Sequence, residues 1–271
     1  MSVVDVNQGP LAGRHAVVTG GSRGIGLAIA QALVEAGANA TLMARDAVRL
    51  ESAIAVLRTR ATTQRLFAVA VDVADEASVN AAFAAARDAN GAIDILVNNA
   101  GVAESAPFAK TSVDQFQRLM DINLKGVWLC TQAFAAGLPK DTAVEAPWRH
   151  VVNVASTAAL KGYAYVAAYC AAKHGVLGLT RALALEWARR RVTVNAVCPG
   201  YTDTDIVAAA VANITAKTGR DADAARMELA RSNPQAQLVT PEQVANAVLW
   251  LVSPGAESMN GQAISVSGGE I

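Results

Sequence analysis

Cysteine, histidine and aromatic residues are scarce in this sequence of 271 residues, which has three cysteines, three histidines and an aromatic share of 5%. Cys130, Cys170 and Cys198 stand far apart and form no C-x-x-C pair. This spacing argues against a disulfide framework and a zinc site, and it fits a reducing compartment. The histidines form no cluster of ligands either, so we expect no metal.

Charge of either sign is also low. Lys and Arg together number 23, as do Asp and Glu, so the formal net charge is zero. Such a balance offers no electrostatic attraction to nucleic acid or to an anionic membrane. No apolar run approaches the length that spans a bilayer, and the first 13 residues lack the regions of a signal peptide. We therefore expect a soluble cytoplasmic protein with neither nucleic acid nor membrane as a partner.

Hydrophobic residues, by contrast, make up 53% of the chain, and alanine supplies much of this share. Short β-branched runs alternate with longer Ala-rich stretches, an order typical of βαβ units. We expect strands over residues 15–19, 41–44, 66–71, 93–97, 151–154, 192–197 and 263–266. The helices are expected over residues 24–36, 46–60, 76–89, 112–136, 163–189 and 241–251.

This alternation predicts an α/β fold, with a doubly wound, mainly parallel seven-stranded sheet that carries helices on both faces. No break in composition divides the chain, so residues 1–271 are expected to form a single domain. Two stretches look like additions to the pattern, a loop over 138–148 and a more polar helical segment over 202–234. The second could be a lid over a site or a merely solvated helix pair.

The stretch Thr19-Gly-Gly-Ser-Arg-Gly-Ile-Gly26 lies between the first predicted strand and the first helix. In a doubly wound sheet this turn binds a dinucleotide, because backbone N–H groups and the helix N-terminus face the phosphates. Gly20, Gly24 and Gly26 would permit the tight turn and the close approach of a cofactor. The alternative is a loop whose glycines serve the backbone alone.

A second constellation, Tyr169-Cys-Ala-Ala-Lys173, lies on a predicted helix. Residues i and i+4 of a helix share a face, so the phenol and the ammonium would be neighbours. A free tyrosine has a pKa of about 10, and a nearby cation favours the phenolate and brings that pKa toward neutral pH. The pair would then be a usable acid or base, although a helix surface pair without a function has the same spacing.

These motifs occur with others in a fixed order. The glycine spacing is G-x-x-x-G-x-G, and it is followed by Asn98-Asn-Ala-Gly101, Ser156, Tyr169-x-x-x-Lys173 and Pro199-Gly200. In this combination the chain, over nearly its whole length, resembles the short-chain dehydrogenase/reductase family. The resemblance implies a Rossmann-type fold and an NAD(P)-dependent oxidoreductase (EC 1.1.1.-). Within the family, the chain looks most similar to reductases of 3-oxoacyl thioesters.

The resemblance implies catalytic roles for four residues. Tyr169 would donate a proton to the carbonyl oxygen of the substrate as hydride arrives from the nicotinamide. Lys173 would lower the pKa of Tyr169 and hydrogen-bond the nicotinamide ribose, and Ser156 would stabilise the developing alkoxide. Asn123, in Met120-Asp-Ile-Asn-Leu124, would hold a water of a proton relay. It could also satisfy backbone groups at a helix distortion, and the two roles are compatible.

The resemblance also implies a cofactor site along the strand ends. Asp72 and Val73 would contact the adenine, the segment Asn99–Gly101 would close around the adenosine side, and Pro199-Gly200 with Thr202 would contact the nicotinamide end. The expected cofactor contacts are Gly20, Ser22, Arg23, Gly24, Ile25, Gly26, Arg45, Asp72, Val73, Asn99, Ala100, Gly101, Tyr169, Lys173, Pro199, Gly200 and Thr202.

The end of the second predicted strand bears on the choice of nicotinamide cofactor. NAD selection in this architecture uses an acidic residue there, which holds the ribose hydroxyls. Here Ala44 leaves room for a 2′-phosphate, and Arg45 could bind that phosphate with Arg23 as a second cation. Asp46 suits the capping of the next helix better than a contact with the ribose. We expect NADP(H), with NAD(H) as the alternative.

We therefore expect an enzyme that uses NADP(H) to reduce a ketone, a 3-oxoacyl thioester or a similar compound, to a secondary alcohol. The stretches 138–148 and 202–234 leave room for bulkier polyketide or aromatic ketones and alcohols as alternative substrates. A non-catalytic regulator that binds the cofactor is a further reading, because function does not follow from fold. All four expected catalytic residues are present, which favours the enzyme. The resemblance also implies a homotetramer.

Overall fold

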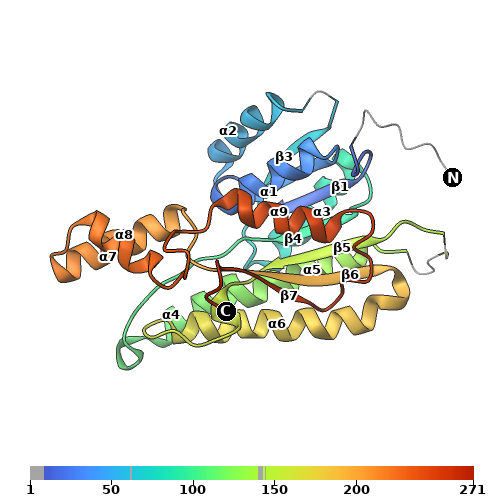
Figure 1. Cartoon of the computed structure of the whole chain (residues 1–271). Coiled ribbons are helices and arrows are strands. Elements are labelled where there is room, and N and C mark those ends of the chain that lie inside the picture. Colours follow the sequence, from blue (N-terminus) through green and yellow to red (C-terminus); the bar gives the residue numbers. More distant parts are fainter. Residues whose placement is uncertain (1–8, 62, 140–142, 144) are drawn as a thin grey trace.

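The computed structural model describes residues 9–61, 63–139, 143 and 145–271. Its centre is a seven-stranded sheet in the order β3-β2-β1-β4-β5-β6-β7, in which every neighbouring pair is parallel (Figure 1). This confirms the predicted fold class. The strands are β1 (His15–Thr19), β2 (Asn39–Ala44), β3 (Leu66–Ala70), β4 (Ile95–Asn98), β5 (Arg149–Val154), β6 (Val192–Pro199) and β7 (Ala263–Val266).

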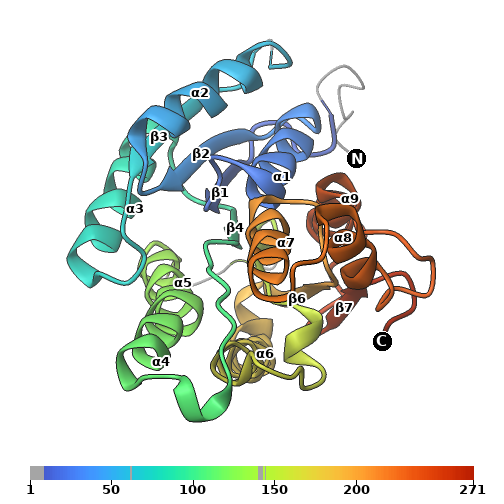
Figure 2. The ribbon, with the colours of Figure 1, turned by 90° about the vertical axis from the view of Figure 1, so that its left-hand side faces the viewer.

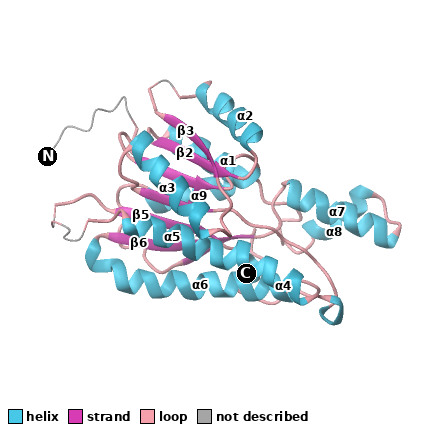
Figure 3. Ribbon diagram, turned by 180° about the vertical axis from the view of Figure 1, so that it is seen from behind, coloured by secondary structure: helices cyan, strands magenta, loops and turns pink. Residues whose placement is uncertain are grey.

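Helices cover both faces of the sheet (Figure 3). The buried side chains of α1, α2 and α9 form one cluster against the sheet, and those of α3, α5 and α6 contribute to a second cluster on the other face. The helices are α1 (Gly24–Glu35), α2 (Ala47–Arg58), α3 (Glu76–Asn90), α4 (Val113–Met120), α5 (Gly126–Ala136), α6 (Ala167–Trp187), α7 (Asp205–Thr218), α8 (Ala222–Ala230) and α9 (Pro241–Val252).

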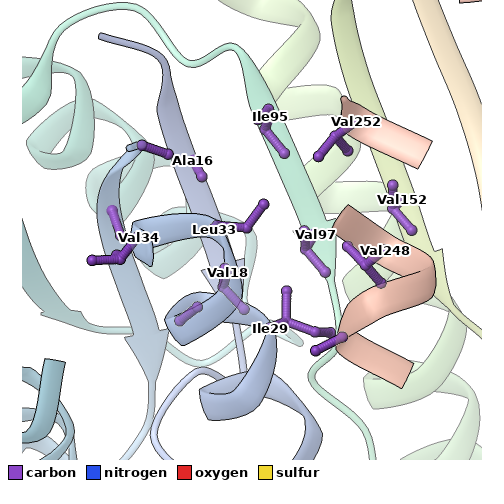
Figure 4. Close-up of a cluster of buried hydrophobic side chains, with 14 of the residues drawn as sticks. Ala16, Val18, Ile29, Leu33, Val34, Ile95, Val97, Val152, Val248 and Val252 are labelled. Atoms are coloured by element: carbon purple, nitrogen blue, oxygen red, sulfur yellow. The ribbon is translucent and has the colours of Figure 1, made fainter. Parts of the chain in front are cut away.

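The core beneath α1 and α9 shows how the apolar pattern becomes packing. Ile29 of α1 and Val248 of α9 face Val18, Val97 and Val152 of three adjacent strands (Figure 4). All five side chains are buried. Burying each such side chain contributes roughly 1.5–3 kcal/mol. The continuous apolar strands are therefore those of a parallel sheet that is covered on both faces.

The order of the strands reverses at β1, which lies between β2 and β4. The chain first builds the sheet outward through β2 and β3, then returns to add β4 on the other side of β1. The turns that follow β1 and β4 therefore leave the carboxyl edge of the sheet in opposite directions. In doubly wound folds, ligands bind at such a reversal of strand order.

The stretch 112–136, predicted as one helix, has a π-helical segment at Asp121–Lys125 between α4 and α5. The side-chain amide of Asn123 in this segment donates a hydrogen bond to the carbonyl of Leu119 at 3.0 Å. A π-segment accommodates an extra residue per turn and is frequent at functional sites. Hydrophobic periodicity does not reveal such a turn, because its flanking residues keep a helical pattern.

The helix expected from residue 163 begins only at Ala167. Tyr165 has a φ of 68°, a left-handed conformation that an ordinary helix cannot contain. Its carbonyl instead accepts a hydrogen bond from the backbone N–H of Ala106 at 2.8 Å. Residues 163–166 are thus a loop, and a tertiary contact overrides their composition.

The sequence predicts two additions to the pattern, the segment 202–234 and the loop over 138–148. The segment 202–234 contains α7 and α8, which project from one end of the sheet (Figure 1). In the loop expected over 138–148, residues 140–142 and 144 lie outside the described residues. In the part of the chain that the structure describes, no helix is long and apolar enough to cross a membrane.

We predict that Gly26→Ala destabilises the protein. A Cβ at this position would lie 2.2 Å from the carbonyl oxygen of Gly20, a backbone atom that cannot turn away. Overpacking of this kind costs about 1–3 kcal/mol, which a lowered midpoint of urea unfolding would report. Gly178→Ala in α6 is the matched control, because a Cβ there meets nothing within 4 Å. It should be neutral or stabilising, and equal midpoints for the two variants would contradict the described turn.

Candidate active site

The turn after β1 is shaped by its glycines. Gly20 and Gly24 have φ values of 66° and 52°, which glycine adopts without strain. Gly26 lies so close to Gly20 that only hydrogen fits between them. The N-cap residue of α1 is Arg23, and its side chain makes no capping hydrogen bond to the described N–H groups of the helix. The first N–H groups of α1 are thus available to a phosphate, as expected for a dinucleotide site.

Hydrogen bonds tie this turn to the one that follows β4. The Thr19 hydroxyl accepts from the backbone N–H groups of Asn99 at 3.0 Å and Ala100 at 3.1 Å. The Asn99 side-chain amide donates to the carbonyls of Thr19 at 3.0 Å and Gly20 at 3.2 Å. The structure therefore brings the predicted contacts from the two turns together, and the Asn99 amide is held by backbone.

The adenosine end of the predicted site lies at the ends of β2 and β3. The backbone N–H of Val71 donates to the carbonyl of Ala44 at 2.9 Å, so Arg45 and Asp72 follow neighbouring strands at their carboxyl ends. Arg45 is exposed. The Asp72 carboxylate accepts from the Ala74 N–H at 3.0 Å, which shapes the turn after β3.

Asp46 and Val73 flank this end of the site, the first as a helix cap and the second as a buried side chain. Asp46 caps α2 by accepting from the N–H of Arg49 at 3.0 Å, as its position predicted. Val73, an expected cofactor contact, is buried and packs closely against Gly126.

Arg23 has a partner that the sequence does not reveal. Its guanidinium pairs with the carboxylate of Asp205, in the first turn of α7, and both side chains are more than half exposed. An exposed pair contributes little to stability, so a phosphate could compete for the guanidinium. Thr204 also approaches Gly24 at this junction, since a Cβ built on Gly24 would lie 3.3 Å from Thr204 Cγ2.

The predicted nicotinamide end follows β6. Pro199 is the last residue of this strand, and the backbone N–H of Gly200 donates to the carbonyl of Val266 at 3.0 Å. The Thr202 hydroxyl donates back to the carbonyl of Gly200 at 3.0 Å. Thr202 also forms a parallel bridge with Val239, so the segment that leads to α7 is held at its start.

Ser156, Tyr169 and Lys173 meet where β5 ends and α6 begins. Ser156 starts a short 3-10 helix, Thr157–Ala159, and its hydroxyl accepts from the N–H of Ala158 at 3.1 Å. The Lys173 ammonium donates to the carbonyl of Val154 at 2.9 Å and lies 5.6 Å from the centroid of the Tyr169 ring. The predicted i, i+4 relation within α6 is thus realised.

Burial controls the protonation of this pair. Burial raises the pKa of Tyr169 to about 12, although a hydrogen bond with the Ser156 hydroxyl acts to lower it. It also lowers the pKa of Lys173 to about 8. The cost of burying a phenolate dominates this shift, and the expected lowering of the Tyr169 pKa by Lys173 stays a prediction. Near neutral pH, Tyr169 holds its proton firmly.

Asn123 is fully buried beside this group. Its amide nitrogen donates to the carbonyls of Val102 at 2.9 Å and Leu119 at 3.0 Å, and its oxygen accepts from the Val102 N–H at 3.2 Å. A Cβ on Gly101 would lie 2.8 Å from that oxygen and 3.7 Å from Lys173 Nζ. Asn123 thus satisfies backbone groups at the π-segment and lies near Lys173.

Two residues near the site escaped the sequence analysis, Asp205 and Glu270. Asp205 pairs with Arg23, and Glu270 binds Lys161 and Tyr163 in the loop before α6. Both contacts join segments that are far apart in the chain and carry no motif. Within the described residues, no group of three or more His, Cys, Asp or Glu side chains could hold a metal ion.

Comparison with known proteins places the chain in a family. The short chain dehydrogenase family matches residues 14–215. The 3-oxoacyl-[acyl-carrier-protein] reductase of Vibrio harveyi is 35% identical, over 96% of this chain and 98% of that protein. The 2-(R)-hydroxypropyl-CoM dehydrogenase of Xanthobacter autotrophicus is 35% identical, over 94% and 97%. A crystal structure of actinorhodin polyketide ketoreductase with NADPH has a TM-score of 0.88 and 33% identity, over 95% and 97%.

The fold and the strand-end site define a dinucleotide-dependent oxidoreductase. The chain belongs to the short-chain dehydrogenases. The resemblance carried by the glycine turn and by Tyr169-x-x-x-Lys173 is thereby confirmed at the level of the family.

We predict that Asn123→Ala lowers the free energy of unfolding by roughly 2–4 kcal/mol. Three backbone groups would lose their partner, and each unsatisfied buried group costs about 1–3 kcal/mol. Chemical denaturation measures the loss. Asn213→Ala is the control, because its amide makes a single exposed hydrogen bond, to Ser105 at 3.3 Å. The control should change stability by less than about 0.5 kcal/mol, and similar losses in both variants would refute the role of Asn123.

Proposed function

We propose that the protein reduces a ketone to a secondary alcohol with NADPH, and that Tyr169 is the proton donor. The observation that carries this proposal is a half-buried tyrosine with a raised pKa, next to Ser156 and Lys173 at the carboxyl edge of the sheet. A phenol that stays protonated suits donation to a forming alkoxide. The Vibrio harveyi and actinorhodin relatives are named as reductases of this kind.

The glycine turn fits the cofactor, because a Cβ at Gly26 or Gly20 would fill the space that the turn leaves beside Asn99. The first N–H groups of α1 would bind the pyrophosphate, Arg45 and Asp72 the adenosine end, and Gly200 with Thr202 the nicotinamide end. When bound, the cofactor supplies the hydride that reduces the carbonyl carbon. The hydride and one proton together convert C=O to CH–OH.

The chain's own residues would manage that proton. The hydroxyls of Ser156 and Tyr169 would both donate to the carbonyl oxygen, which orients the substrate and stabilises charge as it develops. Tyr169 then transfers its proton to the alkoxide oxygen. The Lys173 ammonium, held by Val154, would stabilise the phenolate that remains until solvent returns a proton. Asn123 would hold the backbone of Val102 and the π-segment in place near Lys173.

The substrate we propose is a 3-oxoacyl thioester or a similar 3-oxo compound. A polyketide ketone is the second candidate, favoured by the structural likeness to actinorhodin ketoreductase and by the projecting helices α7 and α8. Figure 2 shows these two helices on the side of the molecule from which a substrate would approach the strand ends. We propose that they form a lid, tied to the glycine turn through Arg23 and Asp205.

NADP(H) is the cofactor we propose, with NAD(H) as the alternative. Ala44 at the end of β2 carries no acidic group for the ribose, and the Arg45 side chain is exposed beside it. NADPH and NADP occur in two similar solved structures. Arg23 could add a second cation once it leaves Asp205.

We further propose that residues 1–271 act as a single domain in the cytoplasm and assemble as a homotetramer. The cysteines are free and buried, as expected in a reducing compartment. Exposed apolar side chains gather on α4 to α6, among them Val113, Phe116, Trp128 and Leu185. Contact with a second copy of the chain would remove such side chains from water.

We predict that Tyr169→Phe abolishes ketone reduction. Loss of the proton donor should lower kcat with acetoacetyl-CoA and NADPH by at least about 100-fold, measured by NADPH absorbance, while NADPH binding stays intact. Tyr165→Phe is the matched control, because that phenol is exposed and outside the proposed machinery. It should keep wild-type activity. Substantial turnover by the Tyr169→Phe variant would place the acid elsewhere.

We predict that Arg45→Asp reverses the preference between cofactors. Loss of a charge-assisted hydrogen bond to the 2′-phosphate costs about 1.5–3 kcal/mol, so the KM for NADPH should rise roughly 10-fold to 100-fold. The KM for NADH should change little. Arg58→Asp, the same charge change at an exposed position of α2, should alter neither constant. An equal rise for both cofactors in the Arg45 variant would disprove the phosphate contact.

A further inference from the structure

Glu270, in the turn after β7, is a carboxylate in an unusual place. Gly268 and Gly269, which precede it, have φ values of 63° and 96° and turn the chain back toward the sheet. The Glu270 side chain is 3% exposed. Burying a carboxylate costs several kcal/mol unless partners compensate, so its contacts need an explanation.

One oxygen of Glu270 binds the loop between β5 and α6. Oε1 accepts from the Lys161 ammonium at 3.0 Å and from the Tyr163 hydroxyl. The oxygen of that hydroxyl is also 2.7 Å from Oγ1 of Thr157. A carboxylate can only accept, so the single phenolic proton of Tyr163 points to Glu270. The Tyr163 oxygen then accepts from the Thr157 hydroxyl, and the chain of hydrogen bonds has one direction.

This chain ends next to Ser156. Thr157 is the following residue and the first of the 3-10 helix that Ser156 caps. The Thr157 carbonyl accepts from the N–H groups of Leu160 at 2.9 Å and Lys161 at 3.1 Å. Residues 157–161 therefore form a closed turn, and Glu270 holds it at both ends, through Lys161 and through Tyr163.

The other oxygen of Glu270 faces the nicotinamide end of the predicted site. Oε2 lies 3.3 Å from the position of a Cβ on Gly200, and among the described residues it has no hydrogen-bond partner. The ring of Tyr201 stands edge-on to that of Tyr163, with 6.5 Å between the centroids. Glu270 thus lies between the turn that carries Ser156 and the segment that follows β6.

We infer that Glu270 is a positioning residue for Ser156. Through Tyr163 and Thr157 it sets where the Ser156 hydroxyl lies relative to the carbonyl oxygen of the substrate. The inference rests on the proposed ketone reduction. It accounts for a buried carboxylate with one oxygen unsatisfied. Such an arrangement contributes little to stability, but it fixes the position of the turn beside Ser156.

Steady-state kinetics with acetoacetyl-CoA and NADPH tests this role. Because small displacements at a reacting group cost up to about 100-fold in rate, Glu270→Ala and Tyr163→Phe should each lower kcat roughly 10-fold. Since both act through one chain, the double variant should fall no further than about two-fold below the single ones. In a Ser156→Ala background, Glu270→Ala should have no additional effect. The KM for NADPH should stay within about two-fold throughout.

Glu51→Ala, at an exposed position of α2, is the control and should match the wild type. An unchanged kcat for Glu270→Ala, multiplied losses in the double variant, or a further loss in the Ser156→Ala background would each overturn the inference. If Glu270→Ala does not fold, the same comparison is made with Tyr163→Phe, in the wild type and in the Ser156→Ala variant. The Tyr163 side chain is only half-buried, so this substitution should leave the fold intact.

Hydrogen exchange separates this inference from the proposed function. Amides of residues 157–163 should exchange about 10-fold faster in Glu270→Ala or Tyr163→Phe than in the wild type, because the closed turn loses its hold. Unchanged exchange would overturn the inference even if ketone reduction is confirmed. If the wild type reduces no ketone with NADPH, the proposed function is refuted. Faster exchange in the Glu270→Ala and Tyr163→Phe variants would still support the contact of Glu270 with the turn.

Discussion

The hydrogen bonds between Thr19 and the turn after β4 hold together the edge of the sheet where chemistry can take place. The strand order reverses at β1, so the turns after β1 and β4 would otherwise diverge. Thr19 and Asn99 satisfy each other's backbone groups across this gap. The glycine turn, the N-terminus of α1 and the segment that leads to Asn123 all take their positions from this junction.

Burial, more than attraction between charges, sets the electrostatics beside the junction. Burial raises the pKa of Tyr169 and lowers that of Lys173, so both are driven toward their neutral forms, and the Ser156 hydroxyl opposes this at Tyr169. Such a site holds a proton on the phenol and keeps a weakly solvated ammonium close by. The same balance recurs at Glu270, whose buried carboxylate binds Lys161 and Tyr163 at the cost of one unsatisfied oxygen.

Local patterns and long-range contacts also differ in how far they could be predicted. A helix distortion at Asn123 was one of the two roles predicted for this residue, and the structure gives it as the π-segment at Asp121–Lys125. The left-handed Tyr165 was missed, because its carbonyl binds the N–H of Ala106, which is distant in the chain. The pairing of Arg23 with Asp205 was missed for the same reason. Helix capping by Asp46 was predicted, since its partner is three residues away.

The sequence by itself determined the alternation of strands and helices, the place of the glycine turn and the i, i+4 spacing of Tyr169 and Lys173. These features depend on periodicity and on neighbours along the chain, which can be read without coordinates. The tertiary structure alone decided the pKa direction at Tyr169, the partner of Arg23 and the hold of Glu270 on the Ser156 turn. Burial and contacts between distant segments arise only when the sheet closes on its helices, so no local pattern contains them.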